Sequence, residues 1–204
     1  MAVPNVAPRP TFVRFSSALP PPNFETTLVD QFRIEVVRSI SGTPLIGLEA
    51  GQELMRVESM QGAPPGLGEL LGVTQHAQYQ SSDEAAELAS RPRPPPGFVS
   101  VIIPISKSAE WWALGHAERA KLFRSQGEQG HIHVGRPYVA HIHRKLYHSR
   151  YLPNARWDFI TYFEFEPERT EEFRALVAGL RDTRKNPEWA FVERESEIWL
   201  RKTG

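Results

Sequence analysis

The chain has 204 residues, with 24 basic and 24 acidic side chains, seven histidines, 18 prolines and no cysteine. Its length suits one domain or two fused half-size units, and its 40% of hydrophobic residues are enough for a buried core. The balanced charge argues against nucleic acid or an anionic membrane as a partner, and the absence of cysteine excludes disulfides, thiolate nucleophiles and cysteine-ligated metal sites.

The first part of the sequence is rich in proline and has no targeting pattern. Met1–Arg14 lacks a basic segment followed by an apolar one, and no run approaches 18 apolar residues. We therefore expect a cytoplasmic chain without a membrane span. Six prolines within residues 1–23 predict a flexible tail, and the proline tract at 91–97 predicts a stiff connector between a unit at 24–97 and a unit at 98–204.

The unit at 24–97 has the pattern of a reduced α+β fold. Alternating apolar residues predict strands at Leu28–Ile40, Leu54–Met60 and Gly72–Tyr79. A capping box at 81–84 predicts a short helix through Ala89. No helix is predicted between residues 41 and 53, where a complete ferredoxin-like unit has its first helix, so we expect this unit to be degenerate.

The unit at 98–204 has a complete pattern. Apolar periodicity predicts a strand at Phe98–Ile105, a helix at His116–Ser125, strands at Val139–Ser149 and Asp158–Glu166, a helix at Thr170–Arg181 and a strand at Ala190–Leu200. This β-α-β-β-α-β order is the ferredoxin-like, split βαβ plan. We therefore predict an α+β protein in which two ferredoxin-like units, the first degenerate, form a β-barrel-like core with helices outside.

Histidine is concentrated in one stretch, since five of the seven histidines lie between His131 and His148. Two His-x-His pairs occur there, at 131–133 and 141–143, and residues i and i+2 of a strand point the same way, so each pair could chelate a metal. A cupin-type site also needs a glutamate soon after the first pair, and residues 134–138 contain none. The alternative for any single histidine is an ordinary surface or hydrogen-bonded residue.

Arg144 occupies an unusual position on the predicted strand Val139–Ser149. Alternation places it between Ile142 and Leu146, on the face expected to be buried. A buried guanidinium is costly without an anionic partner. Either Arg144 reaches solvent near a strand end, or it points into a pocket to hold an anionic substrate. A haem held by one histidine would suit such a pocket, because it needs only a neutral imidazole, a partner for the second ring nitrogen and a polar distal group.

The stretch His143–Ser149, followed by Asp158–Glu164, resembles the chlorite dismutase family. The resemblance extends to residues 103–112, 186–189 and 192–195, so it covers about half of the chain, with a weaker match at 72–79. It implies two ferredoxin-like units per subunit, with haem b in the C-terminal one. The short first half is similar to the compact branch of the family, whose members are dimers, so the resemblance also implies a homodimer.

The resemblance assigns roles to particular residues. In the family the proximal histidine precedes the distal arginine by thirteen residues, which implies His131 as the iron ligand if Arg144 is the catalytic arginine, with His133 as the alternative. Glu188 matches the carboxylate that accepts the second imidazole N–H. Lys107, Trp111 and Tyr79 match residues beside the haem edge and its propionates. Without the resemblance, these three would be interpreted more simply as a solvated lysine and two core aromatics. Val139, Thr161 and Phe163 match the lining of the distal pocket.

The implied reaction is the conversion of chlorite to chloride and dioxygen, a haem-dependent oxidoreductase activity in which Arg144 retains the hypochlorite-level species. A coproheme decarboxylase is the nearest alternative, although those relatives usually have glutamine where Arg144 stands. A dye-decolorising peroxidase would carry a Gly-x-x-Asp-Gly motif, which is absent. A haem-binding sensor or carrier without chlorite turnover, and a ferredoxin-like interaction domain without a cofactor, remain open.

Overall fold

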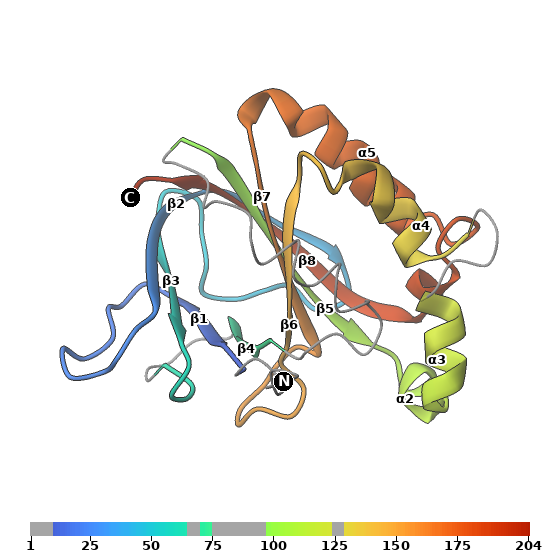
Figure 1. Cartoon of the computed structure of the whole chain (residues 1–204), viewed down its shortest axis with the longest axis horizontal. Helices are drawn as coiled ribbons and strands as arrows, with labels where there is room; N and C mark the ends of the chain where they lie inside the picture. Colours follow the sequence, from blue (N-terminus) through green and yellow to red (C-terminus); the bar gives the residue numbers. More distant parts are fainter. Residues whose placement is uncertain (1–9, 65–69, 75–96, 124–128) are drawn as a thin grey trace, which may run out of the picture.

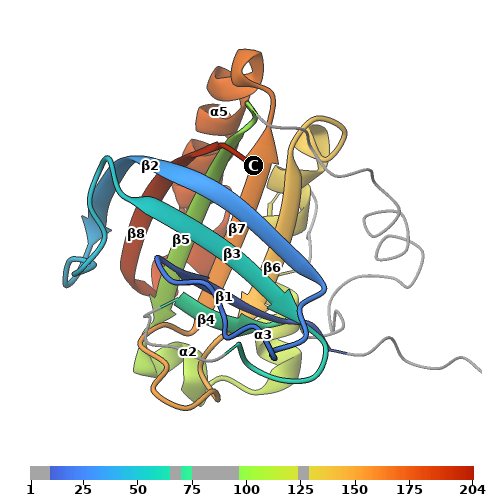
Figure 2. The ribbon, with the colours of Figure 1, turned by 90° about the vertical axis from the view of Figure 1, so that its left-hand side faces the viewer.

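The computed structural model describes residues 10–64, 70–74, 97–123 and 129–204. Their strands form a closed antiparallel barrel in the order β1-β3-β2-β8-β5-β7-β6-β4 (Figure 1). The strands are β1 (Phe12–Ser16), β2 (Leu28–Ser41), β3 (Glu53–Ser59), β4 (Leu70–Val73), β5 (Val99–Lys107), β6 (His143–His148), β7 (Phe159–Phe165) and β8 (Val192–Lys202). Figure 2 shows β2 and β3 as a layer in front of β5, β6 and β7.

The helices lie together on one side of the barrel, over the outer face of the β5–β8 segment (Figure 1). The α-helices are α2 (Ala109–Ala113), α3 (His116–Phe123), α4 (His131–Gly135) and α5 (Thr170–Arg181), and the 3-10 helices are η1 (Arg136–Tyr138), η2 (Pro167–Arg169) and η3 (Pro187–Phe191). None of the helices in the described ranges has the length and apolar character needed to cross a bilayer.

Strands β5, β7 and β8 are buried on both faces, which explains the nearly continuous apolar run predicted at 98–105. Ile102, Tyr162 and Ile198 belong to the core inside the barrel. Their neighbours Phe163 and Trp199 point the other way and belong to a second core, which α5 covers. Because successive strand residues point to opposite faces, each of these strands contributes to both cores.

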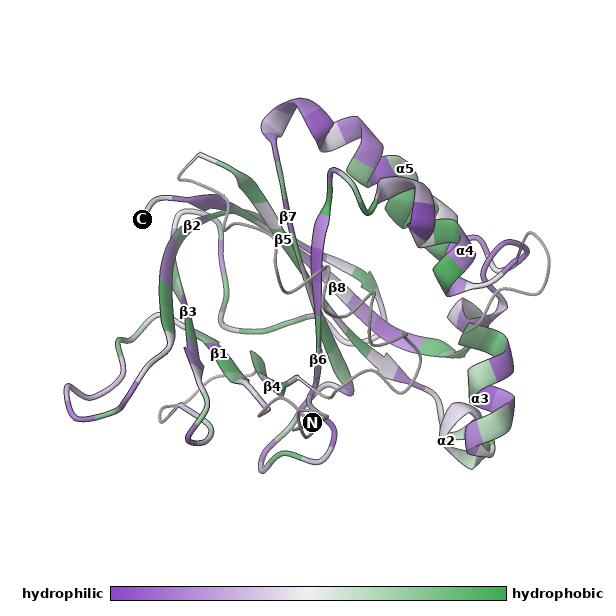
Figure 3. Ribbon diagram, viewed as in Figure 1, coloured by the Kyte–Doolittle hydropathy of each residue, from purple (hydrophilic) through white to green (hydrophobic). Residues whose placement is uncertain are grey.

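Helix α5 closes the outer core with one apolar stripe. Phe173, Leu176, Val177 and Leu180 are its buried residues, and their spacing of three and four positions places them on one face. Figure 3 shows polar residues between these apolar ones, and it also shows β6 as a mainly hydrophilic strand. Helix α4 packs closely against α5 at Gly179, where a Cβ atom would lie 3.0 Å from Val134 Cγ1.

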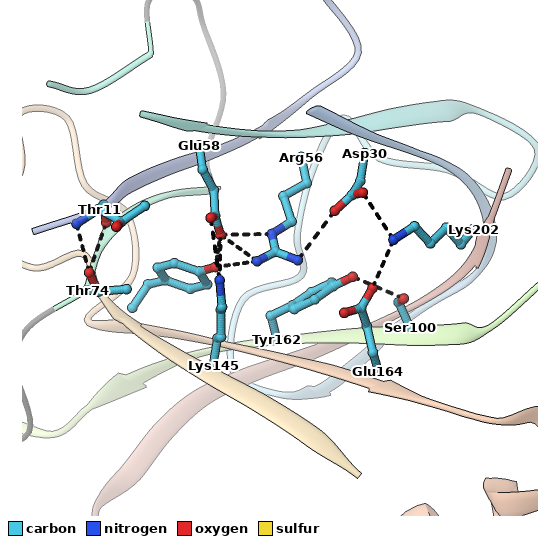
Figure 4. Close-up of polar contacts among 11 residues, drawn as sticks. Thr11, Asp30, Arg56, Glu58, Thr74, Ser100, Lys145, Tyr162, Glu164 and Lys202 are labelled. Carbon is cyan, nitrogen blue, oxygen red and sulfur yellow. Dashed lines mark hydrogen bonds and ion pairs between the residues drawn. The ribbon is translucent and has the colours of Figure 1, made fainter. Parts of the chain in front are cut away.

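The barrel interior also contains a network of charged side chains from several strands (Figure 4). The hydroxyl of Tyr147 donates to Glu58 Oε1 at 2.6 Å, and Arg56 pairs with the same carboxylate. Lys202 Nζ lies 3.0 Å from Asp30 Oδ1 and 3.6 Å from Glu164 Oε1. With Lys145, which contacts Glu58, three cations face three carboxylates. The network is therefore balanced in charge and joins the walls of the barrel.

The predicted fold class is confirmed, because the structure has the α+β barrel and the ferredoxin-like order β5-α3-β6-β7-α5-β8. The predicted flexible tail at 1–23 is wrong for Phe12–Ser16, which forms β1 between β3 and β4 with its side chains mostly buried. Val13 and Phe15 belong to the core inside the barrel, but so few apolar residues next to a proline-rich stretch give only a weak strand pattern. The predicted helix at 81–89 lies outside the described residues.

Candidate functional site

A cavity of about 280 Å³ lies between the outer face of β5–β7 and the helices. The strands contribute Ile103, Ile105 and Phe163 to its walls, so the strand side is largely apolar. Arg144, His148 and Thr161 are the polar residues on that side. A largely apolar cavity with a few polar groups is the usual form of a cofactor or ligand site.

His131 enters this cavity from the start of α4. Gly130 precedes it with φ of 107°, a backbone conformation that favours glycine, and the turn positions His131 as the first helical residue. The imidazole is 8% exposed and stacks on Phe123 with ring centroids 4.5 Å apart. Burial lowers the pKa of His131, and the charge of Arg144 lowers it further, so the neutral imidazole is favoured.

Glu188 connects His131 to a buried lysine. Its Oε2 lies 3.1 Å from His131 Nδ1, and its Oε1 accepts a hydrogen bond from Lys107 Nζ at 2.7 Å. Burial acts to raise the pKa of Glu188, but Lys107 and the hydrogen bond with His131 outweigh it and lower the pKa to about 2. Because the carboxylate is ionised, the neutral imidazole donates from Nδ1, which leaves the Nε2 lone pair available as a metal ligand.

Arg144 projects from β6 into the cavity. Its Nε is buried and makes no hydrogen bond to any residue the structure describes. Its neighbour on the adjacent strand β7 is Phe163. Two residues further along β6, Leu146 lies opposite Thr161 of β7. Burial lowers the pKa of the Arg144 guanidinium, although Glu188 opposes this effect. A cation in such apolar surroundings is suited to receive an anion.

The other sequence-predicted residues divide into two groups. Thr161, Phe163 and Trp111 line the cavity. Lys107 does not line the cavity. Its Nζ forms an ion pair with Glu188 and lies 4.7 Å from the centroid of the Trp111 ring. Tyr79 lies outside the described residues.

The prediction for Val139 is wrong, because Val139 is 45% exposed and does not line the cavity. The strand that was expected to begin there begins at His143, since Pro137 continues the turn of α4 as η1. His133 also lies away from the cavity. It follows His131 by two residues on a helix rather than on a strand, so the two rings point in different directions, and His133 is exposed.

A metal site made of two His-x-His pairs requires both histidines of a pair to point the same way, and His131 and His133 do not do so on a helix. Among the residues with described positions, no three histidine or carboxylate side chains come close enough to hold a metal ion. His131 is therefore the histidine that the cavity presents together with a carboxylate partner.

The sequence reasoning missed one wall of the cavity. His116, Arg119 and Phe123 of α3 line it, at spacings of three and four residues that place them on one helical face. The sequence predicts this helix, and the spacing of the three residues is the signal that they share one face. Trp112, His148 and Arg150 were also missed as lining residues.

The protein is therefore an α+β barrel with a cavity between the outer face of its sheet and a layer of helices. A model of the family described as chlorite dismutase matches residues 48–195, and the chain belongs to this family.

The similar proteins agree with this assignment. The chlorite dismutase of Ideonella dechloratans is 35% identical over 101 residues, which are 47% of this chain and 33% of that relative, so the match spans about a third of the relative's length. The dimeric chlorite dismutase of Nitrobacter winogradskyi has a TM-score of 0.68 at 28% identity, with 94% of this chain and 99% of that chain covered. A chlorite dismutase from Candidatus Nitrospira defluvii, in complex with imidazole, has a TM-score of 0.61 at 26% identity, with 87% of this chain and 74% of that chain covered.

Proposed function

We propose that this protein is a haem b enzyme that converts chlorite to chloride and dioxygen. The observation that carries the proposal is the pairing, in one cavity, of a neutral histidine held by a buried carboxylate with an arginine whose Nε has no partner among the residues with described positions. Membership of the chlorite dismutase family supports an oxidoreductase.

The described residues fit a haem. His131 would ligate the iron through Nε2, because Glu188 occupies Nδ1. Glu188 would give the imidazole anionic character, and Lys107 would hold the carboxylate in place. Trp111, whose indole nitrogen is buried without a partner among the described residues, would lie beside the haem edge. When bound, the haem iron would supply the redox centre at which a Cl–O bond is cleaved.

Arg144 is the residue we propose as catalytic. Its guanidinium would bind the chlorite anion by charge-assisted hydrogen bonds and retain the hypochlorite-level species in the cavity. Thr161 and Phe163 would line the distal side and limit the access of water. Both oxygen atoms of the product come from chlorite, so the reaction needs no external electron donor.

A homodimer is the proposed assembly. The support is the likeness to the dimeric enzyme of Nitrobacter winogradskyi, which is covered almost completely by this chain. A one-protomer mass in sedimentation equilibrium would contradict the dimer.

Haem titration of the purified chain tests the proposed cofactor site. We expect stoichiometric haem with a Soret band for the parent chain, and loss of high-affinity binding in His131→Ala, because the axial ligand is gone. His133→Ala is the matched control and should bind haem like the parent, since its side chain points away from the cavity. Stoichiometric, tight haem in His131→Ala would transfer the ligand assignment to another residue.

The other candidate functions give different outcomes in the same preparation. Coproheme decarboxylation would release carbon dioxide from coproheme when peroxide is added. A sensor or carrier would show the Soret band but release no oxygen from chlorite. A domain without a cofactor would show no Soret band even after haem is added.

A further inference from the structure

Part of the cavity has donor groups that the proposed reaction does not use. Arg119 lines the cavity from α3, and its Nε is buried without a hydrogen-bond partner among the residues that the structure describes. Arg150 lines the same cavity from the turn that follows β6. Buried donors without partners are rare in native proteins, so an acceptor from a ligand is expected at this place.

The two arginines lie around a single indole ring. Arg150 Cζ is 4.0 Å from the centroid of the Trp112 ring, and Arg119 Cζ is 5.6 Å from it. Trp112 stacks on Phe159 with centroids 5.9 Å apart and an interplanar angle of 13°. We refer to Trp112, Arg119 and Arg150 as the arginine–tryptophan cluster.

This cluster lies away from Arg144. Phe159 contacts His148 with ring centroids 5.0 Å apart, so the arginine–tryptophan cluster is near the end of β6. Arg144 precedes His148 by four residues on the same strand face, which corresponds to about 13 Å along an extended strand. A ligand that contacts both Arg144 and the cluster must therefore be long. His131 stacks on Phe123, which lies one helical turn from Arg119 on the same face of α3.

The charges around the cavity favour an anionic ligand. Its lining includes three arginines, at 119, 144 and 150, and Glu188 is its one carboxylate among the described residues. Lys107 pairs with Glu188, and Asp158 pairs with Arg150 at 2.9 Å. The Asp158 carboxylate also accepts the Trp112 indole N–H at 3.2 Å, which fixes the cluster in place. Arg119 has no such carboxylate partner within the described ranges, so it is the cation at this end best placed to receive an anion.

We propose that the arginine–tryptophan cluster binds the carboxylate groups of a planar tetrapyrrole, with Arg119 as the main contact and Arg150 as the second. This inference rests on the proposed haem site. A guanidinium presents paired N–H donors that match a carboxylate, and an aromatic ring beside it suits a flat apolar ligand. Carboxylate recognition at this end would set which way round the ligand lies between His131 and Arg144.

The test compares a porphyrin with its ester. Metal-free protoporphyrin IX and its dimethyl ester are titrated into the purified chain, depleted of any haem, and binding is followed by quenching of tryptophan fluorescence and by porphyrin absorbance. The diacid should bind the parent chain about tenfold more tightly than the ester, because the ester cannot accept a charge-assisted hydrogen bond. Arg119→Gln should lower diacid affinity by about tenfold and leave ester affinity unchanged.

Controls separate carboxylate recognition from a structural role. Arg33→Gln changes an exposed arginine on β2 and should match the parent with both ligands. Arg119→Lys keeps a cation and should recover part of the preference for the diacid. Equal affinity of the parent chain for diacid and ester would overturn the inference without any variant, and so would an equal loss of both affinities in Arg119→Gln.

The failure of this inference is distinguishable from failure of the proposed function. If haem binds the parent and Arg119→Gln with the same affinity, the carboxylate site is wrong and the haem site stands. If the parent chain binds neither haem nor the diacid, both proposals fall.

Discussion

Arg144 could be singled out from the sequence as a candidate site residue, because a charged side chain is unexpected on the buried face of a strand. A cation between Ile142 and Leu146 on an alternating strand calls for an anionic partner. Glu188 and Lys107 carried no such local signal, since they are 81 residues apart and their contact depends on the closed barrel. Only the family resemblance suggested them. Arg119 was missed because a charged residue on a short helix usually faces solvent.

Replacing Arg144 with alanine should lower chlorite turnover and shorten the lifetime of the bound haem. The reason is that the reactive oxychlorine species would no longer be held by a guanidinium and would escape to attack the protein and cofactor. We expect a decrease in kcat of one to two orders of magnitude, in line with the loss of one charge-stabilising donor. The measurement is oxygen release together with bleaching of the Soret band.

Arg144→Lys is the informative control, because it keeps the positive charge but not the paired N–H donors. It should lie between the parent and Arg144→Ala. Unchanged turnover and haem lifetime in Arg144→Ala would remove the proposed catalytic role.

His148 should make the protein less stable in mild acid. Burial lowers the pKa of His148 to about 4, whereas a histidine in the unfolded chain titrates near 6.5. Between these two pH values the unfolded chain binds the proton and the folded chain does not, so the free energy of unfolding falls as the pH decreases from about 6.5 to about 4. The contribution lost is on the order of 3 kcal/mol.

Urea unfolding of the purified chain at several pH values between 4 and 7 measures this effect. His148→Gln should have a shallower dependence of stability on pH than the parent. His133→Gln, on the exposed side of α4, is the matched control and should follow the parent. An identical pH dependence in His148→Gln and the parent would show that His148 does not titrate as its burial implies.

At the scale of elements, long periodic segments were predicted well and short or interrupted ones were not. The predicted helix at 170–181 coincides with α5, because four apolar residues recur at helical spacing and charged residues lie at both ends of the segment. β1 was missed, since its few residues lie among prolines. The beginning of β6 was placed too early, because the alternation of apolar and polar residues starts at Val139, whereas residues 139–141 form the turn that follows η1.

Helix α5 should be essential for the stability of the outer core. Phe173 is 1% exposed and stacks on Phe165 with ring centroids 4.6 Å apart. Phe173→Ala should lower the free energy of unfolding by about 3–5 kcal/mol, because the substitution removes buried area and leaves a cavity. Urea denaturation followed by circular dichroism measures the change.

Glu171→Ala provides the control on the same helix. Glu171 is exposed and forms a surface ion pair with Arg174, so its removal should change stability by about 0.5 kcal/mol or less. A loss below 1 kcal/mol in Phe173→Ala would mean that α5 contributes little to the core.

At the scale of the whole molecule, the barrel separates two polar regions that the sequence could not distinguish. Inside the barrel, the network around Arg56 pairs cations and carboxylates from β2, β3, β6, β7 and β8 (Figure 4). Outside it, Arg144 and Arg119 have donor atoms without partners in the part of the chain that the structure describes. Closed networks support the fold, whereas unsatisfied donors mark the region available to a ligand.

The chain has no net charge, but its charges are unevenly distributed around the cavity. Three arginines line the cavity although basic and acidic residues are equal in number over the whole sequence. Attraction of an anion therefore depends on the local field of the cavity and not on net charge. The order of helices and strands in residues 98–204 and the family could be predicted from the sequence, but this local imbalance depends on contacts between distant segments.

The central claim is that the haem-loaded protein decomposes chlorite. The most direct measurement is oxygen release after chlorite is added to the haem-loaded chain, with no electron donor present and with chlorite consumption followed in parallel. We expect one molecule of oxygen for each molecule of chlorite consumed. A fully haem-loaded chain that consumes chlorite without releasing oxygen, or that leaves chlorite unchanged, would contradict it.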